Sequence, residues 1–207
     1  MKLPPLHAVT ILHYVVAYTV VALVLGSPSI SDADDPAQSQ LARTLYEEGL
    51  DLAGQERWHE AIDRFERAFA IRAEPAIALN LASALMAENR LIEASEWLGQ
   101  AAIRSQSHAV RDLAISLRTD IARRIGHIVI VLPGDQTGWS VTLDGKDVTR
   151  TLGTRDLAVD PGEHIVALLR NGVLIRSTTI EIPPGSFRRI VLDRNTDRNV
   201  SLLSVPR

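Results

Sequence analysis

The hexapeptide Arg57-Trp58-His59-Glu60-Ala61-Ile62 returns thirty-three residues later as Arg90-Leu91-Ile92-Glu93-Ala94-Ser95. Around it, small residues return as small ones and large apolar residues as large ones: Gly49, Ala61, Phe65 and Ala68 become Ala82, Ala94, Leu98 and Ala101. Small residues at fixed places let paired helices approach closely, and large ones fill the space between them. A period in the thirties with helical spacing of apolar residues indicates an array of helix–turn–helix repeats.

The repeat region is expected to cover residues 41–125. Residues 41–72 have the pattern of two helices broken near Gly54, and Pro75 marks the end of this first unit. Because each unit buries its apolar face only against a neighbour, two units are marginal on their own. A further helix over 107–125, with an apolar stripe and arginines outside it, is predicted to cap the array.

The composition changes at Gly126, where helical spacing gives way to short β-branched runs separated by turn residues. These runs predict strands at 127–132, 139–143, 156–160, 164–169, 173–182 and 187–192. Asp144-Gly145 and Asn171-Gly172 are typical of the tight turns that join hairpin strands. Residues 127–192 therefore predict a small antiparallel β-sandwich, which makes the chain an α+β protein. Residues 193–207 form a tail that is expected to fray, or to add an edge strand at 200–205.

The first thirty-three residues have the order of an export segment. Lys2 supplies positive charge, residues 8–26 carry no formal charge, and a small polar stretch follows. This is the order of a cleaved signal peptide. Nineteen residues nevertheless form a helix of roughly 28 Å, so an uncleaved membrane anchor over 8–26 is the alternative, and a buried helix of a cytosolic protein is a third. Residues 34–40 are interpreted as a linker, and the rest of the chain as extracytoplasmic.

Composition excludes several classes of function. The 207 residues carry a net charge of −3 without a basic stripe, so nucleic acid is not an expected partner. Cysteine is absent, which removes disulfides, thiolate metal sites and a cysteine nucleophile. The export prediction therefore implies a protein that folds on core packing alone.

The helical region resembles the tetratricopeptide repeat (TPR) family. Residues 80–85 (NLASAL) look like the signature of that family's first helix, and the two hexapeptides look like the opening of its second helix. The period is one residue shorter than usual, and Ala73 stands at the place of the usual proline. The resemblance implies a concave groove that binds a partner protein or peptide, lined by Tyr46, Leu50, Leu79, Ser83 and Met86. The alternative is that these five residues only pack against the capping helix or the linker.

The β region resembles the PEGA domain. Residues 153–164 (GTRDLAVDPGEH) look like that family's strand, Pro-Gly-x-His turn and second strand, and Asp144-Gly145-Lys146 fits its upstream turn. The family's eponymous tetrapeptide is reduced to the region of Pro133-Gly134-Asp135, and Arg155 replaces a usual proline. A TPR region followed by a PEGA domain resembles envelope proteins of the myxobacterial type. This combination implies a scaffolding or protein-interaction role in the cell envelope.

No catalytic, cofactor or metal site is predicted. The sequence has no nucleophile elbow, phosphate-binding loop, dinucleotide fingerprint or zinc-protease motif. Glu60 and Asp63 lie one turn apart, but their arginine neighbours favour a salt-bridged surface over an acid–base pair. His164, without a second histidine or a spaced carboxylate, is expected to form a structural hydrogen bond across its turn. We therefore expect a non-enzymatic protein.

Two alternatives remain open beside the interaction module. One is a surface protein that binds cell wall, peptidoglycan or a surface polysaccharide through its β domain, with Trp139 as the exposed aromatic residue. The other is a small hydrolase whose catalytic groups meet only in space.

Overall fold

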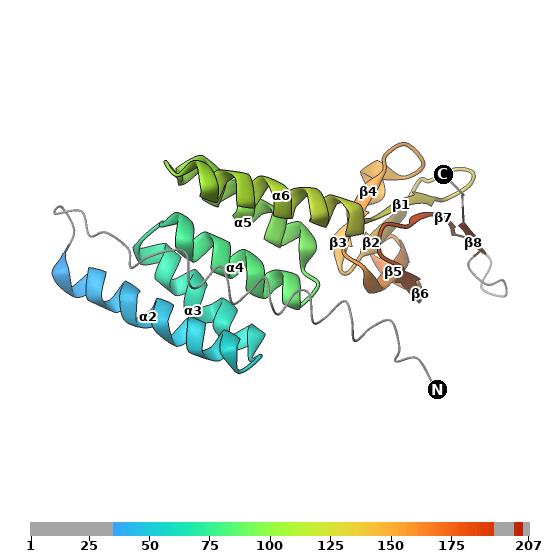
Figure 1. The fold of residues 1–207 in the computed structure, drawn as a ribbon. Helices are drawn as coiled ribbons and strands as arrows, with labels where there is room; N and C mark the ends of the chain where they lie inside the picture. The colour runs from blue at the N-terminus through green and yellow to red at the C-terminus, as the bar shows by residue number, and fades with distance from the viewer. Residues whose placement is uncertain (1–34, 193–200, 205–207) are drawn as a thin grey trace, which may run out of the picture. The chain divides into compact units, whose positions relative to one another are not determined.

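The computed structural model describes residues 35–192 and 201–204, and Figure 1 shows their helices and strands. The chain divides at Arg118/Thr119 into two compact units, here named the helical unit and the β unit. The predicted signal peptide or anchor, 1–33, lies outside the described residues. None of the described helices is both long enough and apolar enough to span a membrane.

The described residues begin with five α-helices: α2 Pro36–Gly54, α3 Trp58–Ile71, α4 Pro75–Ala87, α5 Leu91–Arg104 and α6 His108–Arg124. The start of α2 corrects the linker prediction, because residues 36–40 are helical. The Asp35 carboxylate accepts a hydrogen bond from the Ala37 amide at 3.0 Å, and Pro36 occupies the first helical position. Both are favoured at a helix start, so the segment 34–40 contains its own start signal.

The backbone repeats itself with the predicted period. Helix α5 begins and ends thirty-three residues after α3. The turns before these helices match as well, because Glu56 and Asn89 have φ angles of 60° and 59°. In each turn the next residue, an arginine, donates its amide to a leucine carbonyl five residues earlier, at 3.0 Å and 2.9 Å. The sequence recurrence therefore corresponds to two helical hairpins with the same turn.

Complementary volumes hold each hairpin together. A Cβ atom added at Gly49 would lie 2.5 Å from Cε1 of Phe65, so α2 and α3 approach closely only because position 49 has no side chain. In the second hairpin the equivalent pair is Ala82 and Leu98, both fully buried. A larger residue on one helix is thus matched by a smaller residue on the other. Trp58 and Trp97, one on each second helix, are only partly buried.

Helix α6 begins one period after α4, at His108 against Pro75, as the first helix of a third unit would. Val110 and Ala114 are buried along it. Arg118 lies back over α5, where its Nε is 3.4 Å from the Ser95 hydroxyl. Ala109, next to Val110, is exposed. The predicted capping helix is confirmed, one residue shorter at each end.

The β unit contains two four-stranded sheets with the strand orders β4-β1-β7-β8 and β3-β2-β5-β6. The strands are β1 Gly126–Val131, β2 Trp139–Leu143, β3 Lys146–Asp147, β4 Leu157–Val159, β5 Gly162–Arg170, β6 Val173–Ile182, β7 Phe187–Val191 and β8 Ser201–Ser204. All pairings are antiparallel except that of β1 with β7, which is parallel. The predicted α+β fold with a small, mainly antiparallel sandwich is confirmed, and this one parallel pairing is an addition to it. Strand β8 fits the alternative edge strand predicted at 200–205.

Alternating side chains from both sheets form one apolar core. The strand residues Ile128, Ile130, Val141, Val166, Leu168, Ile180, Ile182 and Ile190 are all buried in it. The predicted turns close the hairpins at this core: Asp144 and Gly145 have φ angles of 49° and 78°, and Asn171 and Gly172 of 48° and 79°. Asn, Asp and Gly tolerate this left-handed region, which is why the turn residues were recognisable in the sequence.

Candidate interaction surfaces

The residues predicted to line the TPR-like groove lie on α2 and α4. Leu79, Ser83 and Met86 are buried, whereas Tyr46 and Leu50 are partly buried. The Tyr46 hydroxyl accepts a hydrogen bond from Asn80 Nδ2 at 2.9 Å, so it is held at the contact between the two helices. Leu79, Ser83 and Met86 thus lie in packing positions, and a charged substitution at Leu79 or Met86 would disturb the fold before it disturbed a partner.

A polar joint fastens α2 to the turn between α3 and α4. Arg72 donates to the Ser39 hydroxyl at 2.9 Å and to the Glu74 carboxylate at 2.7 Å, and both residues of the ion pair are largely buried. Burial, with a smaller contribution from the negative charge of Glu74, raises the pKa of Tyr46. The joint leaves Tyr46 as a neutral phenol that serves packing and hydrogen bonding.

The last helix of the repeat exposes a position that the earlier helices bury. Gly49 of α2 and Ala82 of α4 lie beneath the helix that follows each of them, and the third member of this series is Ile115 of α6. No second helix follows α6, because β1 begins at Gly126, and Ile115 is 57 % exposed. Ile115 was not among the residues predicted to bind a partner. The signal for it is the thirty-three-residue period, which leads from position 82 to position 115.

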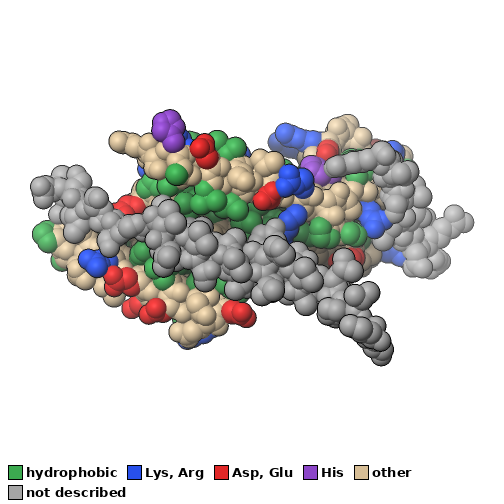
Figure 2. Space-filling model, in the orientation of Figure 1, with side chains coloured by type: hydrophobic (Ala, Val, Ile, Leu, Met, Phe, Trp, Pro, Cys, Tyr) green, Lys and Arg blue, Asp and Glu red, His purple; other side chains and the backbone are tan. Residues whose placement is uncertain are grey.

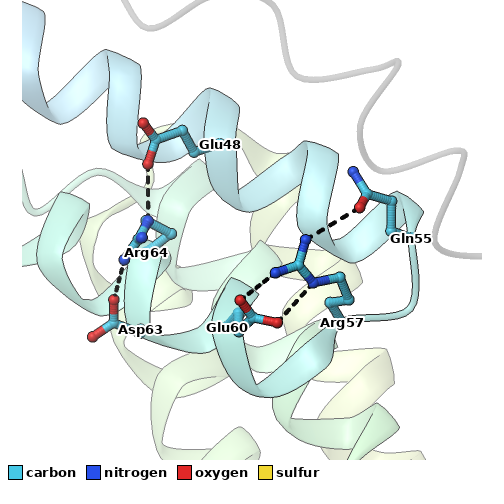
Figure 3. Close-up of polar contacts among 6 residues, drawn as sticks. All are labelled: Glu48, Gln55, Arg57, Glu60, Asp63 and Arg64. Atoms are coloured by element: carbon cyan, nitrogen blue, oxygen red, sulfur yellow. Dashed lines mark hydrogen bonds and ion pairs between the residues drawn. The ribbon is translucent and has the colours of Figure 1, made fainter.

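A network of charged side chains covers the α2–α3 surface (Figure 3). Arg64 joins the two helices through Glu48, with 2.8 Å between Nε and Oε2, and it also bonds Asp63. Arg57 clasps Glu60, which lowers the pKa of that carboxylate. These ion pairs confirm the predicted salt-bridged surface at Glu60 and Asp63. Figure 2 shows further carboxylates along α2 at the lower edge of the helical unit.

His164 fastens two turns of the β unit. Its Nδ1 lies 2.7 Å from Asp144 Oδ2, and its Nε2 lies 2.7 Å from the Asp160 carbonyl oxygen. The other Asp144 oxygen accepts the Ile165 amide at 2.8 Å. Both ring nitrogens therefore face acceptors, and only the imidazolium form donates to both. The hydrogen bond expected across the turn is confirmed, and a second one accompanies it.

The charge of His164 predicts a pH-dependent stability. Burial alone would lower the pKa of His164, but the hydrogen bonds to Asp144 and Asp160 and the negative charges of both residues outweigh it and raise the pKa. A folded-state pKa above the unfolded value contributes stability that is complete below about pH 6.5 and is lost as pH rises through the folded-state pKa.

We expect His164→Asn to remove about 0.5–1 kcal/mol of this pH-dependent part from the free energy of unfolding. Urea titrations at pH 5.5, 7 and 8.5 measure it. The variant His59→Asn changes an exposed histidine and serves as the control. It should keep the pH dependence of the free energy of unfolding. Equal pH profiles for the His164 variant and the unmodified chain would show that the clamp is uncharged in the native protein.

Trp139 stands at the other end of the same sheet. The Arg170 guanidinium lies over its ring, 5.3 Å from the centroid, and Arg170 is also its cross-strand partner. The indole is partly buried, and the cation occupies one of its faces. A sugar ring would have to use the remaining face or displace the arginine.

Among the residues that the structure describes, no three histidine, aspartate or glutamate side chains form a group that could hold a metal ion. Comparison with known proteins does not extend this picture, since no protein-family model and no curated protein matches the chain. What the molecule establishes is its class: an α+β chain in which paired helices precede a two-sheet β unit.

Proposed function

We propose that this chain is a non-enzymatic protein of the cell envelope that binds a partner protein through TPR-like helices, with a PEGA-like β unit as its scaffold. The observation that carries the proposal is the repetition of a complete helical hairpin, including the turn at Glu56 and Asn89, with a period of thirty-three residues. Arrays of this kind serve as extended binding surfaces. The extracytoplasmic location is supported by the charge pattern and the apolar run of residues 1–33.

The end of the repeat offers the surface on which a partner helix fits best. In both preceding units the position equivalent to Ile115 is covered by an antiparallel helix, so α6 has the backbone geometry that receives one. Terminal repeats in soluble arrays usually replace this face by polar residues. Arg111 and Arg118 follow that rule, but Ile115 does not. An amphipathic helix of the partner would bury Ile115, as in helix-in-groove recognition.

The test is site-specific photo-crosslinking in isolated envelopes. A photoreactive residue at position 115 is expected to yield one discrete adduct with the partner protein. A photoreactive residue at the neighbouring exposed position 119 is expected to yield an adduct with the same partner. Ile115→Asp in the chain labelled at 119 should abolish it. A label at Glu181, on the exposed side of β6, is the control that should not form it. Crosslinking that persists with Ile115→Asp would overturn the assignment of this surface. N-terminal sequencing of the protein from fractionated cells tests the location independently.

Binding of cell wall or carbohydrate through the β unit is the second candidate, and the partial exposure of Trp139 favours it. It predicts that the chain sediments with purified peptidoglycan and that Trp139→Ala abolishes sedimentation. A chain that stays in the supernatant at all peptidoglycan concentrations rejects this candidate and leaves the first untouched.

A further inference from the structure

The tip of the β5–β6 hairpin exposes consecutive apolar side chains. Val173, Leu174 and Ile175 follow the Asn171-Gly172 turn, and their exposed fractions are 64 %, 58 % and 38 %. A register shift opposite Ile175, between Leu168 and Leu169, makes room for the additional residue on β6. An exposed apolar cluster that the core does not use marks a contact with another apolar phase or partner.

The tip is held rigidly rather than left as a loose loop. The Asn171 amide donates to the Gly138 carbonyl at 2.7 Å, which ties the hairpin turn to the loop before β2. Arg170 stacks on Trp139 in the neighbouring strand. The hairpin tip is therefore fixed in place, and Val173 lies in register with Arg170, whose own partner on the next strand is Trp139. Tryptophan and arginine are the residues that favour the boundary between lipid headgroups and acyl chains.

Charge is unevenly distributed along this sheet. Asp144, Asp147 and the cross-strand pair Glu163–Glu181 lie at the end opposite the tip. The tip end carries Arg170 and Arg176. The residues of β2, β5 and β6 that pair at this end, 139–141, 168–170 and 173–176, include no acidic residue. The tip thus combines apolar side chains with arginines, whereas the far end carries four carboxylates beside Lys146 and His164.

From this arrangement we propose that the β5–β6 tip inserts into an anionic lipid surface. A convex apolar tip fits a soft interface that closes around it, whereas a folded protein partner would need a matching cavity. The arginines then meet lipid phosphates while the acidic end points into solvent. This contact is separate from the partner surface on α6, so either can fail alone.

The experiment uses the full chain with Trp58→Phe and Trp97→Phe, which leaves Trp139 as the single tryptophan. Vesicles of phosphatidylcholine with phosphatidylglycerol, carrying brominated acyl chains, should quench Trp139, and phosphatidylcholine alone should bind roughly tenfold more weakly. Leu174→Asp should weaken the quenching titration by about tenfold or more. The matched control, Ile103→Asp at an 82 % exposed position of the helical unit, should leave it unchanged.

Each opposite outcome overturns the proposal. Co-sedimentation without quenching of Trp139 would show that another segment, such as residues 8–26, binds the vesicles and the tip does not. An effect of Leu174→Asp on the sedimentation-equilibrium mass, with quenching unaltered, would show that the tip joins two copies of the chain instead. Because Leu174 is exposed, an unchanged thermal transition for Leu174→Asp verifies that the variant is folded.

Discussion

Phe65→Ala is expected to lower the free energy of unfolding of the helical unit by about 3–5 kcal/mol. The ring is fully buried between α2 and α3 and contacts Tyr46 at a centroid distance of 5.9 Å. Its removal leaves a cavity beside Gly49, where no side chain is available to fill it. Urea unfolding followed by circular dichroism, together with amide exchange in α2 and α3, measures the loss. The exposed Ile103→Ala variant is the control and should stay within about 0.5 kcal/mol of the unmodified chain.

A paired exchange tests the reason for this effect more sharply. Gly49→Ala alone should destabilise by about 1–3 kcal/mol, because the new methyl group meets the ring of Phe65. Combining it with Phe65→Leu recreates the Ala82–Leu98 pair of the second hairpin. The double variant is therefore expected to be more stable than the sum of the single changes by about 1 kcal/mol or more. Simple additivity would mean that the two hairpins do not share one packing rule.

Ile130→Ala should destabilise the β unit by about 2–5 kcal/mol. Ile130 is buried near the end of β1, in register with Ile190 of β7, so the truncation opens a cavity in the apolar core. Ile165→Ala, the same change at an exposed site on β5, should have little effect. Hydrogen exchange of the strand amides separates the two variants. Similar protection of the strand amides in both variants would mean that the core does not depend on the side chain of Ile130.

Local sequence signals predicted most of this architecture. The repeat was visible because each hairpin needs a small residue facing a large one at a fixed separation, as at Gly49 and Phe65. The hairpin turns were visible because a left-handed backbone restricts the residues at Asn171 and Gly172. The start of α2 was missed although Asp35 and Pro36 signal it, because the polar composition of 34–40 was interpreted as a linker.

Non-local features were beyond the reach of these signals. Alternation along β1 is the same whether its neighbour runs parallel or antiparallel, so the pairing with β7 had no local signature. The interaction surfaces were only partly predictable for a related reason. Burial of Leu79 and Met86 depends on which elements surround α4. Ile115 is exposed because a strand, β1, follows α6 where a second helix followed α2 and α4. The second hydrogen bond of His164, to Asp144, required a turn twenty residues earlier to be placed in space.

The parallel pairing of β1 with β7 determines when the β unit can fold. The first strand to leave the ribosome finds its central neighbour only after 55 further residues, 132–186, have been synthesised. Closing a loop of that length costs roughly 3–4 kcal/mol of chain entropy before any contact is gained. Early hairpins such as β5–β6 must therefore form first. Until β7 is available, the isoleucines of β1 remain exposed to solvent. The sheet that contains β1 consequently stays incomplete, and its apolar residues remain accessible to proteases, until β7 emerges.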